Sequence, residues 1–376
     1  MGLDSAVLTV FVSVGRSDFG IAQPVARALG ESGSCEVAWA VCGADERAFS
    51  ESERVVRVPS SAGEIGAEMG ALVSGFASAF ADLRPDFVVL VGDRYETICA
   101  ALPCVVTGVP IVHLHGGELT YGAFDDSLRH AITKMASIHC VAAAEYGERV
   151  ARMGEERWRI HLTGAAGLDT FVRSPKLSGA ELSAALGWEV PERFLLATLH
   201  PETRCALSAE EQASIFLSGL EGLDLPVVFT APNADPGGSV IRSRVVAACD
   251  LQADWRMVES FGPGLYGSVL QLASAMVGNS SSGILEAASA RLPVVNIGAR
   301  QDGRLRGRNV RDADWDVAEI REAVSWALAP RRKAGFSKLV NPYGDGTASE
   351  KIVRVILDAP PRHLLLVKKF NDAGAW

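Results

Sequence analysis

The sequence predicts an α/β protein that contains two doubly wound, Rossmann-like domains. Short runs rich in Val, Ile and Leu alternate with amphipathic segments of helical period along the chain. Apolar strands separated by helices are typical of parallel sheets covered by helices on both faces. The pattern pauses near residues 165–190 and then restarts, and 376 residues with 48% hydrophobic side chains suit two or three domains.

The N-terminal domain is expected to span residues 1–170. Each predicted strand is a continuous apolar run that ends near glycine or a polar residue, as "AVLTVFVSVG" does at residues 6–15. Each predicted helix spaces its apolar residues three and four apart, as in "GEIGAEMGALVSGFASAFADL". The predicted strands cover 6–15, 35–41, 85–93, 109–116, 138–144 and 159–164, and the helices cover 19–32, 63–83, 97–108 and 125–136.

The C-terminal domain is expected to span residues 171–355 and to repeat the same alternation. The tail, residues 356–376, contains "RHLLLVKKFNDAGAW" and is expected to form a helix that packs back on the body. The predicted strands of this half cover 193–200, 225–232, 255–260, 275–280 and 292–298, and the helices cover 177–188, 208–223, 239–249, 266–275 and 282–290.

Composition excludes several classes of protein. The net charge of −9 disfavours binding to nucleic acid or to an anionic membrane. Seven scattered cysteines without a C-x-x-C pair argue against a disulfide framework or a structural zinc site. The apolar run Ala6–Val14 is too short to span a bilayer, and Asp4 precedes it where a signal peptide carries Lys or Arg. We therefore expect a soluble, cytoplasmic protein.

Polar clusters follow five of the predicted strands. Ligands of doubly wound sheets bind beyond the carboxyl ends of the strands, so five clusters at that end predict one coherent site. We expect the two domains to face each other across a cleft that these clusters line. The clusters are "GRSD" after the first strand, "GDRYE", "HLHGGE", "HPETR" and "GNSSSG".

"GNSSSG" is a Gly/Ser turn that opens a predicted helix. Free backbone N–H groups and the helix dipole favour an anion there, so Ser280, Ser281, Ser282 and Gly283 are candidate phosphate-binding residues. The alternative is a simple N-cap, because serine is a favoured capping residue. Glu286 could accept hydrogen bonds from ribose hydroxyls or could be a solvated helix residue.

Arginines near the predicted cleft could neutralise a diphosphate. Arg300 follows the strand 292–298, and Arg16 follows the first strand. The forked guanidinium suits phosphate, although a solvated charged loop is the alternative for each of them. The chain has no G-x-x-x-x-G-K-[ST] and no clean G-x-G-x-x-G after its first strand. A P-loop NTPase and a dinucleotide dehydrogenase are therefore disfavoured.

Carboxylates gather in the clusters of the N-terminal half. Asp93, Glu118 and Asp125 could act as acid, base or stabiliser of a developing cation if their surroundings separate their pKa values. For Asp125 and its neighbour Asp126 the alternative is that one of the pair caps helix 125–136.

Histidines raise the question of a metal. His113 and His115 form H-x-H on a strand, a possible zinc pair, but no cysteine is close and Arg129 and Lys134 would repel a cation, so no metal is expected. His139 is predicted to be a buried structural histidine. His200 ends a strand inside "HPETR" and is the better functional candidate.

These clusters, in this order, resemble the UDP-N-acetylglucosamine 2-epimerase family, particularly its hydrolysing branch. The resemblance spans about 90% of the chain. The long second motif is the most specific. The matching segments are "GDRYE", "HLHGGELTYGAFDDSLRHAITKMASIH", "TLHPET", "FTAPNADPGGS", "GNSSSGILEA", "VNIGARQDGR" and "KKF".

The resemblance implies a fold like that of the GT-B glycosyltransferases, with the active site between the domains. It implies cleavage of a nucleotide-linked 2-acetamido sugar with inversion at C2, through a glycal and without a cofactor, to give an N-acetylmannosamine-type sugar for sialic-acid-type synthesis. It also implies a homodimer or homotetramer. The expected catalytic residues are Asp93, Glu118, Asp125, His115 and His200, and the expected substrate- or nucleotide-binding residues are Arg16, Asp18, Arg94, Arg129, Asn233, Ser280, Ser281, Ser282, Gly283, Glu286 and Arg300.

One position departs from the pattern of several sialic-acid-pathway members, which read H-x-E-G-G-E. His115 stands where their first glutamate acts in catalysis, so either Glu118 takes over that role or His115 serves as the second acid/base. The H-x-H-G-G-E form resembles a sub-branch for legionaminic-acid-type sugars, which leaves the nucleotide base and the C4 substituent open. The alternatives are a non-hydrolysing 2-epimerase and a nucleotide-sugar-binding protein without catalysis.

Overall fold

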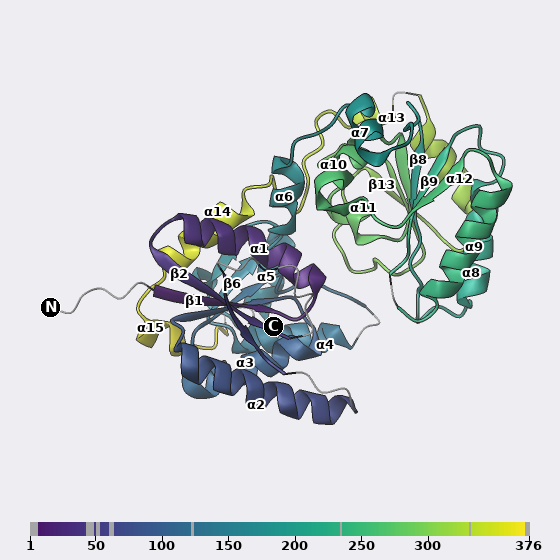
Figure 1. Ribbon diagram of the computed structural model, residues 1–376. Helices are drawn as coiled ribbons and strands as arrows, with labels where there is room; N and C mark the ends of the chain where they lie inside the picture. The colour runs from purple at the N-terminus through teal and green to yellow at the C-terminus, as the bar shows by residue number, and fades with distance from the viewer. Residues whose placement is uncertain are drawn as a thin grey trace. The chain divides into compact units, whose positions relative to one another are not determined.

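The computed structural model describes residues 7–42, 49, 53–59, 64–121, 124–233, 235–330 and 332–372, and the side chains of Arg16, Ser17 and Pro263 are outside the described atoms. The chain forms two compact units. Unit 1 comprises Met1–Thr170 and Tyr343–Trp376, and unit 2 comprises Phe171–Pro342. Figure 1 shows a sheet with helices on both of its faces in each unit.

Unit 1 contains a seven-stranded parallel sheet of order β3-β2-β1-β4-β5-β6-β7. Its strands are β1 Val7–Ser13, β2 Cys35–Val41, β3 Arg54–Arg57, β4 Phe87–Val91, β5 Ile111–Leu114, β6 Ile138–Val141 and β7 Ile160–Leu162. Its helices are α1 Arg16–Glu31, α2 Ile65–Leu83, α3 Tyr95–Thr107, α4 Asp125–Met135, α5 Ala144–Arg152, α14 Ala348–Leu357 and α15 Arg362–Leu366, and α6 Gly167–Arg173 crosses into unit 2.

Unit 2 contains a six-stranded parallel sheet of order β10-β9-β8-β11-β12-β13. Its strands are β8 Leu195–Thr198, β9 Val227–Thr230, β10 Trp255–Val258, β11 Ala275–Gly278, β12 Val294–Ile297 and β13 Val310–Ala313. Its helices are α7 Gly179–Leu186, α8 Ala209–Leu220, α9 Gly238–Leu251, α10 Gly262–Leu272, α11 Ser281–Leu285, α12 Val317–Leu328 and α13 Arg332–Gly335.

Both sheets bury apolar residues on both faces, as the continuous apolar runs predict. In β1, Val10 and Val12 pack into the core on one face, and Phe11 packs with Trp39 into the core on the other. Unit 2 likewise has one apolar core on each face of its sheet. The prediction of two doubly wound α/β domains is therefore confirmed.

The boundary near the C-terminus differs from the expected residue 355. The chain returns to unit 1 at Tyr343, so α14 belongs to the N-terminal unit. The reason is that α14 buries Ile352 and Ile356 in the core beside α1, where Figure 1 shows the two helices together. The side chain of Asp169 accepts hydrogen bonds from the backbone N–H groups of Ala348 (3.0 Å) and Ser349 (2.6 Å), which holds the start of α14.

The predicted helix 282–290 is much shorter in the structure. Helix α11 ends at Leu285, and the N–H groups of Glu286 and Ala287 both donate to the carbonyl of Ser282. The chain then tightens into a turn that leads to Arg291, whose φ of 55° is left-handed and cannot continue a helix. Helical spacing alone does not reveal this early end.

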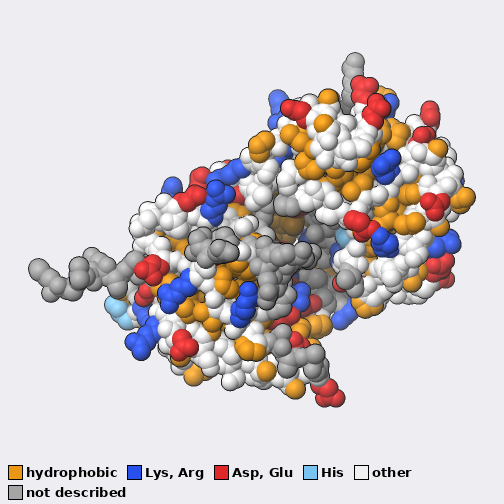
Figure 2. Space-filling model, in the orientation of Figure 1, with side chains coloured by type: hydrophobic (Ala, Val, Ile, Leu, Met, Phe, Trp, Pro, Cys, Tyr) orange, Lys and Arg blue, Asp and Glu red, His pale blue; other side chains and the backbone are white. Residues whose placement is uncertain are grey.

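Acidic and basic side chains are interspersed over the face drawn in Figure 2, as expected of a chain that carries both signs of charge. Among the described residues, no helix is long and apolar enough to cross a membrane.

Candidate active site

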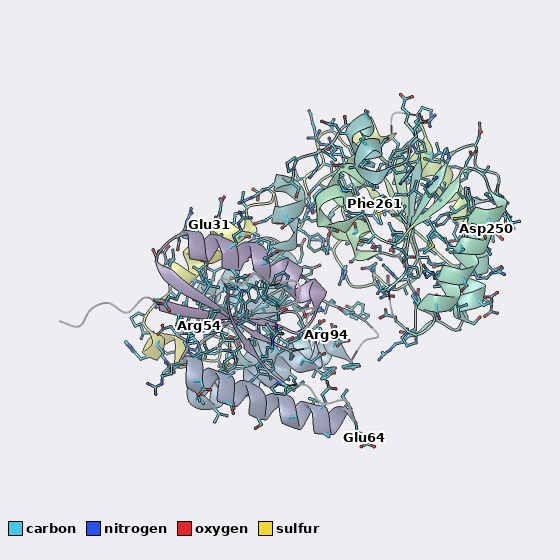
Figure 3. The ribbon with its side chains drawn as sticks, viewed as in Figure 1. Glu31, Arg54, Glu64, Arg94, Asp250 and Phe261 are labelled. Carbon is cyan, nitrogen blue, oxygen red and sulfur yellow. The ribbon has the colours of Figure 1, made fainter. Side chains whose placement is uncertain are left out.

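The first candidate site of unit 1 lies where the strand order reverses, between β1 and β4. Ligands of open α/β sheets bind at this point, outside the carboxyl ends of the strands. Gly15 follows β1, and a side chain there would meet Arg94 Nη1 and Asp18 Oδ2 at 3.8 Å each. Arg94, labelled in Figure 3, also pairs with Glu96 at 2.8 Å. The first turn of α1, which follows β1, and the loop after β4 thus bring Asp18 and Arg94 close together.

Asp93 follows β4 and is paired with a buried arginine. Arg129 on α4 donates from Nη2 to Asp93 Oδ2 and to the hydroxyl of Thr120, the latter at 3.0 Å. The Arg129 side chain is 5% exposed and that of Asp93 is 20% exposed. Arg129 Nε and Nη1 are buried without a hydrogen-bond partner among the described atoms. The three N–H groups on these two nitrogens therefore remain as candidate donors to a ligand, beside the Asp93 carboxyl group.

His115 and Glu118 form a second pair after β5. His115 Nδ1 lies 2.6 Å from Glu118 Oε1, and both side chains are largely buried. His115 has a φ of 64°, a left-handed conformation that is uncommon outside glycine. Gly117 makes the close turn possible, because a Cβ there would lie 2.5 Å from the carbonyl of Tyr146. The loop therefore presents an imidazole backed by a carboxylate.

His113 is a further functional candidate, although its place in the H-x-H motif suggested only a possible metal ligand. It is fully buried, and its Nε2 lies 2.8 Å from the carbonyl of Gly92, the residue before Asp93. Its Nδ1 lies 3.2 Å from the hydroxyl of Thr133 on α4. Burial lowers the pKa of His113 to about 3, so the ring is neutral at physiological pH. His113 therefore ties the Asp93 loop to α4.

Neither aspartate at the start of α4 caps the helix with its side chain. The N-cap residue is Phe124, and Asp126 Oδ1 instead accepts from the backbone N–H of Thr120 at 2.8 Å. The capping alternative is therefore wrong for this pair. Burial, and then the nearby charge of Asp93, raise the pKa of Asp125. A half-buried carboxyl of raised pKa is suited to proton transfer.

The candidate site of unit 2 also lies at a reversal of strand order, between β8 and β11. The backbone N–H of His200 donates to Asn279 Oδ1 at 2.7 Å, and Asn279 Nδ2 donates to the carbonyl of His200 at 2.8 Å. The N–H of Asn233 donates to His200 Nδ1 at 3.0 Å. Burial, and then Arg300, lower the pKa of His200 to about 4. Asn279 lies within the quoted "GNSSSG", but sequence reasoning did not single it out.

The serine turn after β11 has a structural role in capping α11. Ser280 is the N-cap of α11, and its hydroxyl accepts from Ser282 N at 3.4 Å. Ser282 Oγ lies 2.7 Å from Tyr266 Oη. At Gly283 a Cβ would lie 2.9 Å from Val294 Cγ1, so this glycine allows close packing of α11 on β12. Capping therefore accounts for Ser280, while Ser281 is half-buried at the first helical position.

Glu286 and Arg300 complete the predicted residues of unit 2. Glu286 Oε2 is buried without a hydrogen-bond partner among the described atoms, and burial raises the pKa of this carboxyl. Asn233 Oδ1 is another such buried acceptor. Arg300 Nη2 lies 3.4 Å from Asp235 Oδ2. Unpaired acceptors of this kind suit the hydroxyl groups of a ligand.

Two other residues named from the sequence have different outcomes. The backbone of Arg16 begins α1, but its side chain lies outside the described residues. His139 is fully buried and its Nε2 lies 3.0 Å from Glu155 Oε2, which confirms the structural role predicted for it. No three His, Cys, Asp or Glu side chains in the described part of the chain are arranged to hold a metal ion.

The chain matches a known protein family over most of its length. Residues 53–357 match the family model described as UDP-N-acetylglucosamine 2-epimerase. The chain belongs to the UDP-N-acetylglucosamine 2-epimerase family. The resemblance inferred from the motifs is therefore confirmed.

Relatives of this family include two hydrolysing enzymes. The GDP/UDP-N,N'-diacetylbacillosamine 2-epimerase (hydrolyzing) of Campylobacter jejuni is 34% identical over 306 residues, which cover 81% of this chain and 79% of the relative. The UDP-N,N'-diacetylbacillosamine 2-epimerase (hydrolyzing) of Legionella pneumophila is 30% identical over 377 residues, which cover 96% and 98%. By these relatives the chain is placed with the hydrolysing branch of the 2-epimerase family.

Solved structures of the family share the fold. The Neisseria meningitidis UDP-GlcNAc 2-epimerase bound to UDP-GlcNAc matches with a TM-score of 0.78 and 17% identity, over 94% of this chain and 100% of that one. A protein of Listeria monocytogenes described as a UDP-N-acetylglucosamine 2-epimerase matches with a TM-score of 0.78 and 16% identity, over 95% and 98%. At this identity the match establishes the two-domain α/β architecture alone.

Proposed function

We propose that this 2-epimerase family member hydrolyses a nucleotide-linked 2-acetamido sugar and releases the free C2 epimer with a nucleoside diphosphate. The observation that carries the proposal is the group in unit 1: Asp93 paired with Arg129, His115 paired with Glu118, and Asp125 of raised pKa. These residues come from the ends of two neighbouring strands and the start of one helix, so the fold gathers acid, base and cation-stabilising groups.

The chemistry requires such groups because C2–H beside an acetamido substituent is not acidic by itself. The C1–O bond to the diphosphate breaks first, and its electron pair leaves with the phosphate oxygen. Cationic character at C1 then acidifies C2–H, a base removes that proton, and a C1=C2 glycal forms. Water adds its hydroxyl to C1, and a proton adds to the opposite face of C2. The net change is addition of one water molecule.

In unit 1, we assign Asp93 to stabilising the cationic centre. The hydrogen bond from Arg129 offsets the cost of burying the Asp93 side chain and keeps it oriented. Glu118 accepts the Nδ1–H of His115, which leaves Nε2 of the imidazole as a base for the C2 proton. Asp125 returns a proton to the other face, a role suited to its raised pKa. The sequence left Glu118 and His115 as alternatives for one role. Their contact supports a joint role for the two residues.

In unit 2, we assign the polar groups after β8 and β11 to the nucleotide. Glu286 Oε2 and Asn233 Oδ1 are buried acceptors suited to hydroxyl groups, and the ribose supplies two. Arg300 and the half-buried Ser281 would hold the diphosphate. His200 is held neutral by burial, so it can donate a hydrogen bond to the leaving group without adding charge.

The names of two relatives suggest the first substrate to test. Both are described as acting on N,N'-diacetylbacillosamine linked to a nucleotide, UDP in one case and GDP or UDP in the other. We propose UDP-N,N'-diacetylbacillosamine, with the GDP-linked sugar and UDP-GlcNAc as the competing substrates, and we expect the enzyme to be a homodimer or homotetramer that acts in the cytoplasm.

The experiment is incubation of the purified protein with each of these three nucleotide sugars in D2O, followed by NMR. We expect one of them to give nucleoside diphosphate and a free sugar in equal amounts, with inverted configuration and deuterium at C2. An intact epimerised nucleotide sugar would instead identify a non-hydrolysing epimerase. Retention of the substrate hydrogen at C2 would contradict the glycal, and binding without turnover would identify a binding protein.

A further inference from the structure

The C-terminal tail, defined here as residues 362–371, is bound to the rest of unit 1 by hydrogen bonds from a fully buried arginine. Arg159 is fully buried and donates to the carbonyls of Leu365 (2.9 Å), Leu364 (3.2 Å) and Val367 (2.9 Å). Leu365 is itself fully buried in the apolar core beside α14. The predicted tail helix covers only Arg362–Leu366, and an irregular segment follows it.

Lys368 in that irregular segment binds the C-terminal end of α4 through its ammonium group. Its Nζ donates to the carbonyls of Lys134 and Ala136, both at 2.7 Å, and lies 2.8 Å from Glu155 Oε2. These carbonyls belong to the last turn and the C-cap of α4, where a cation also matches the helix dipole. All three donors of the ammonium group are therefore satisfied, and two of them hold the helix.

Glu155 joins the same contacts from the other side. It is fully buried and accepts from Lys134 Nζ at 2.6 Å as well as from His139 Nε2 at 3.0 Å. Burial alone would raise the pKa of Glu155, but the hydrogen bonds from His139, Lys134 and Lys368 outweigh it and hold the pKa at about 2. The carboxylate therefore stays ionised and pairs with both lysines.

Helix α4 is the element whose other end carries the proposed chemistry. It starts at Asp125, and it places Arg129 against Asp93 and Thr133 against His113. Its 11 residues span about 16 Å, so Lys368 holds the helix at the end opposite Asp125, next to Thr133. A small shift of the helix along its axis would move both Asp125 and Arg129, because a helix moves as a rigid body.

We propose that Lys368 is a positioning residue for the reaction, acting through α4 on Asp125 and Arg129. This inference rests on the proposed function. Loss of the ammonium group frees the carbonyls at the end of α4 and leaves Glu155 with one fewer cation, so the helix loses its fixed axial position. The substrate-binding groups of unit 2 are untouched, so the loss is expected in kcat and not in KM.

The test compares Lys368→Met with Lys369→Met, a control at the next residue, whose side chain is exposed. Below the melting temperature of each variant, we expect Lys368→Met to lower kcat roughly tenfold with KM within roughly twofold of wild type. Lys369→Met should match wild type, and Lys368→Arg, which keeps the charge, should recover most of kcat. A Lys368→Met kcat equal to that of Lys369→Met overturns the proposal.

Hydrogen exchange separates this inference from the proposed function. The amides of residues 129–136 should exchange faster in Lys368→Met than in Lys369→Met, whether or not the wild type turns over any nucleotide sugar. Equal exchange overturns the positioning role, whereas an inactive wild type overturns only the reaction. If Lys368→Met does not fold, Phe370→Ala provides the second variant, because this 66% exposed ring packs on Gly154 and anchors the same segment. A wild-type kcat in a folded Phe370→Ala would likewise contradict the proposal.

Discussion

Arg129 on α4 pairs with Asp93 after β4, although the two residues are 36 positions apart in the chain. One guanidinium nitrogen contacts both Asp93 and Thr120, while Nε and Nη1 have no hydrogen-bond partner among the described atoms. Removing a buried charged partner costs more than removing an exposed one, because the remaining carboxylate stays in a poorly solvated place. Arg129 is therefore expected to matter for both orientation and charge.

Arg129→Met should lower kcat by roughly a hundredfold or more, because Asp93 loses its partner and the substrate loses the donors on Nε and Nη1. Arg152→Met on the exposed side of α5 is the matched control and should stay near wild type. Steady-state kinetics on the substrate identified by NMR provides the measurement. If both variants lose activity equally, the pair has no specific role in the reaction.

The contact of His115 with Glu118 predicts that the two residues act as one unit. His115→Gln, Glu118→Gln and the double variant should each lower kcat by roughly a hundredfold, with the double variant no worse than a few fold beyond either single one. Glu145→Gln, at an exposed position, is the control. Independent losses that multiply in the double variant would show that the residues do not share one proton-transfer step.

Glu286 is predicted to recognise the ribose of the nucleotide. Glu286→Gln keeps the shape of the side chain but replaces one acceptor oxygen with a donor, so affinity for the nucleoside diphosphate should fall by roughly tenfold. The sharper measurement is calorimetric binding of the nucleoside diphosphate and of its 2'-deoxy form. Wild type should prefer the ribose form, and the variant should lose that preference. An unchanged preference would place the ribose contact elsewhere.

Stability should fall as the pH drops below about 6.5, the pKa of an unfolded-state histidine. Burial lowers the pKa of His113 to about 3 and that of His200 to about 4, so the unfolded chain binds protons that the folded chain does not. Each such histidine lowers the free energy of unfolding by up to about 1.4 kcal/mol per pH unit until its folded pKa is reached. The histidines whose pKa is lowered by burial are His113, His130, His139, His161 and His200.

Urea unfolding at pH 7.5, 6.5 and 5.5 measures this dependence. His113→Gln is expected to lower the free energy of unfolding at every pH. It should also make that free energy fall less steeply between pH 6.5 and 5.5, because unfolding of the variant takes up as much as one proton fewer. The slope is therefore the diagnostic quantity, because a purely structural loss would shift all three values equally. An unchanged slope would mean that His113 is protonated in the folded state.

The sequence by itself determined the fold class and the location of the candidate groups along the chain. Apolar runs of strand length, each followed by a polar cluster, are a local property, and parallel strands necessarily bring their carboxyl ends to one edge. For that reason the clusters at Asp93, at Glu118 and at the serine turn are predicted to be parts of a candidate site. The sequence also pointed to the tail as a segment that packs back on the body.

Tertiary structure decided which of these groups are partners. Strand order, which no local pattern encodes, puts the loops after β1 and β4 side by side, and those after β8 and β11 as well. It also decided that α14 completes unit 1, because its apolar face fits the core beside α1. The pairings of Arg129 with Asp93, and of Lys368 with the end of α4, join residues distant in sequence. Such contacts depend on burial and geometry in three dimensions, so residue type and spacing alone could not reveal them.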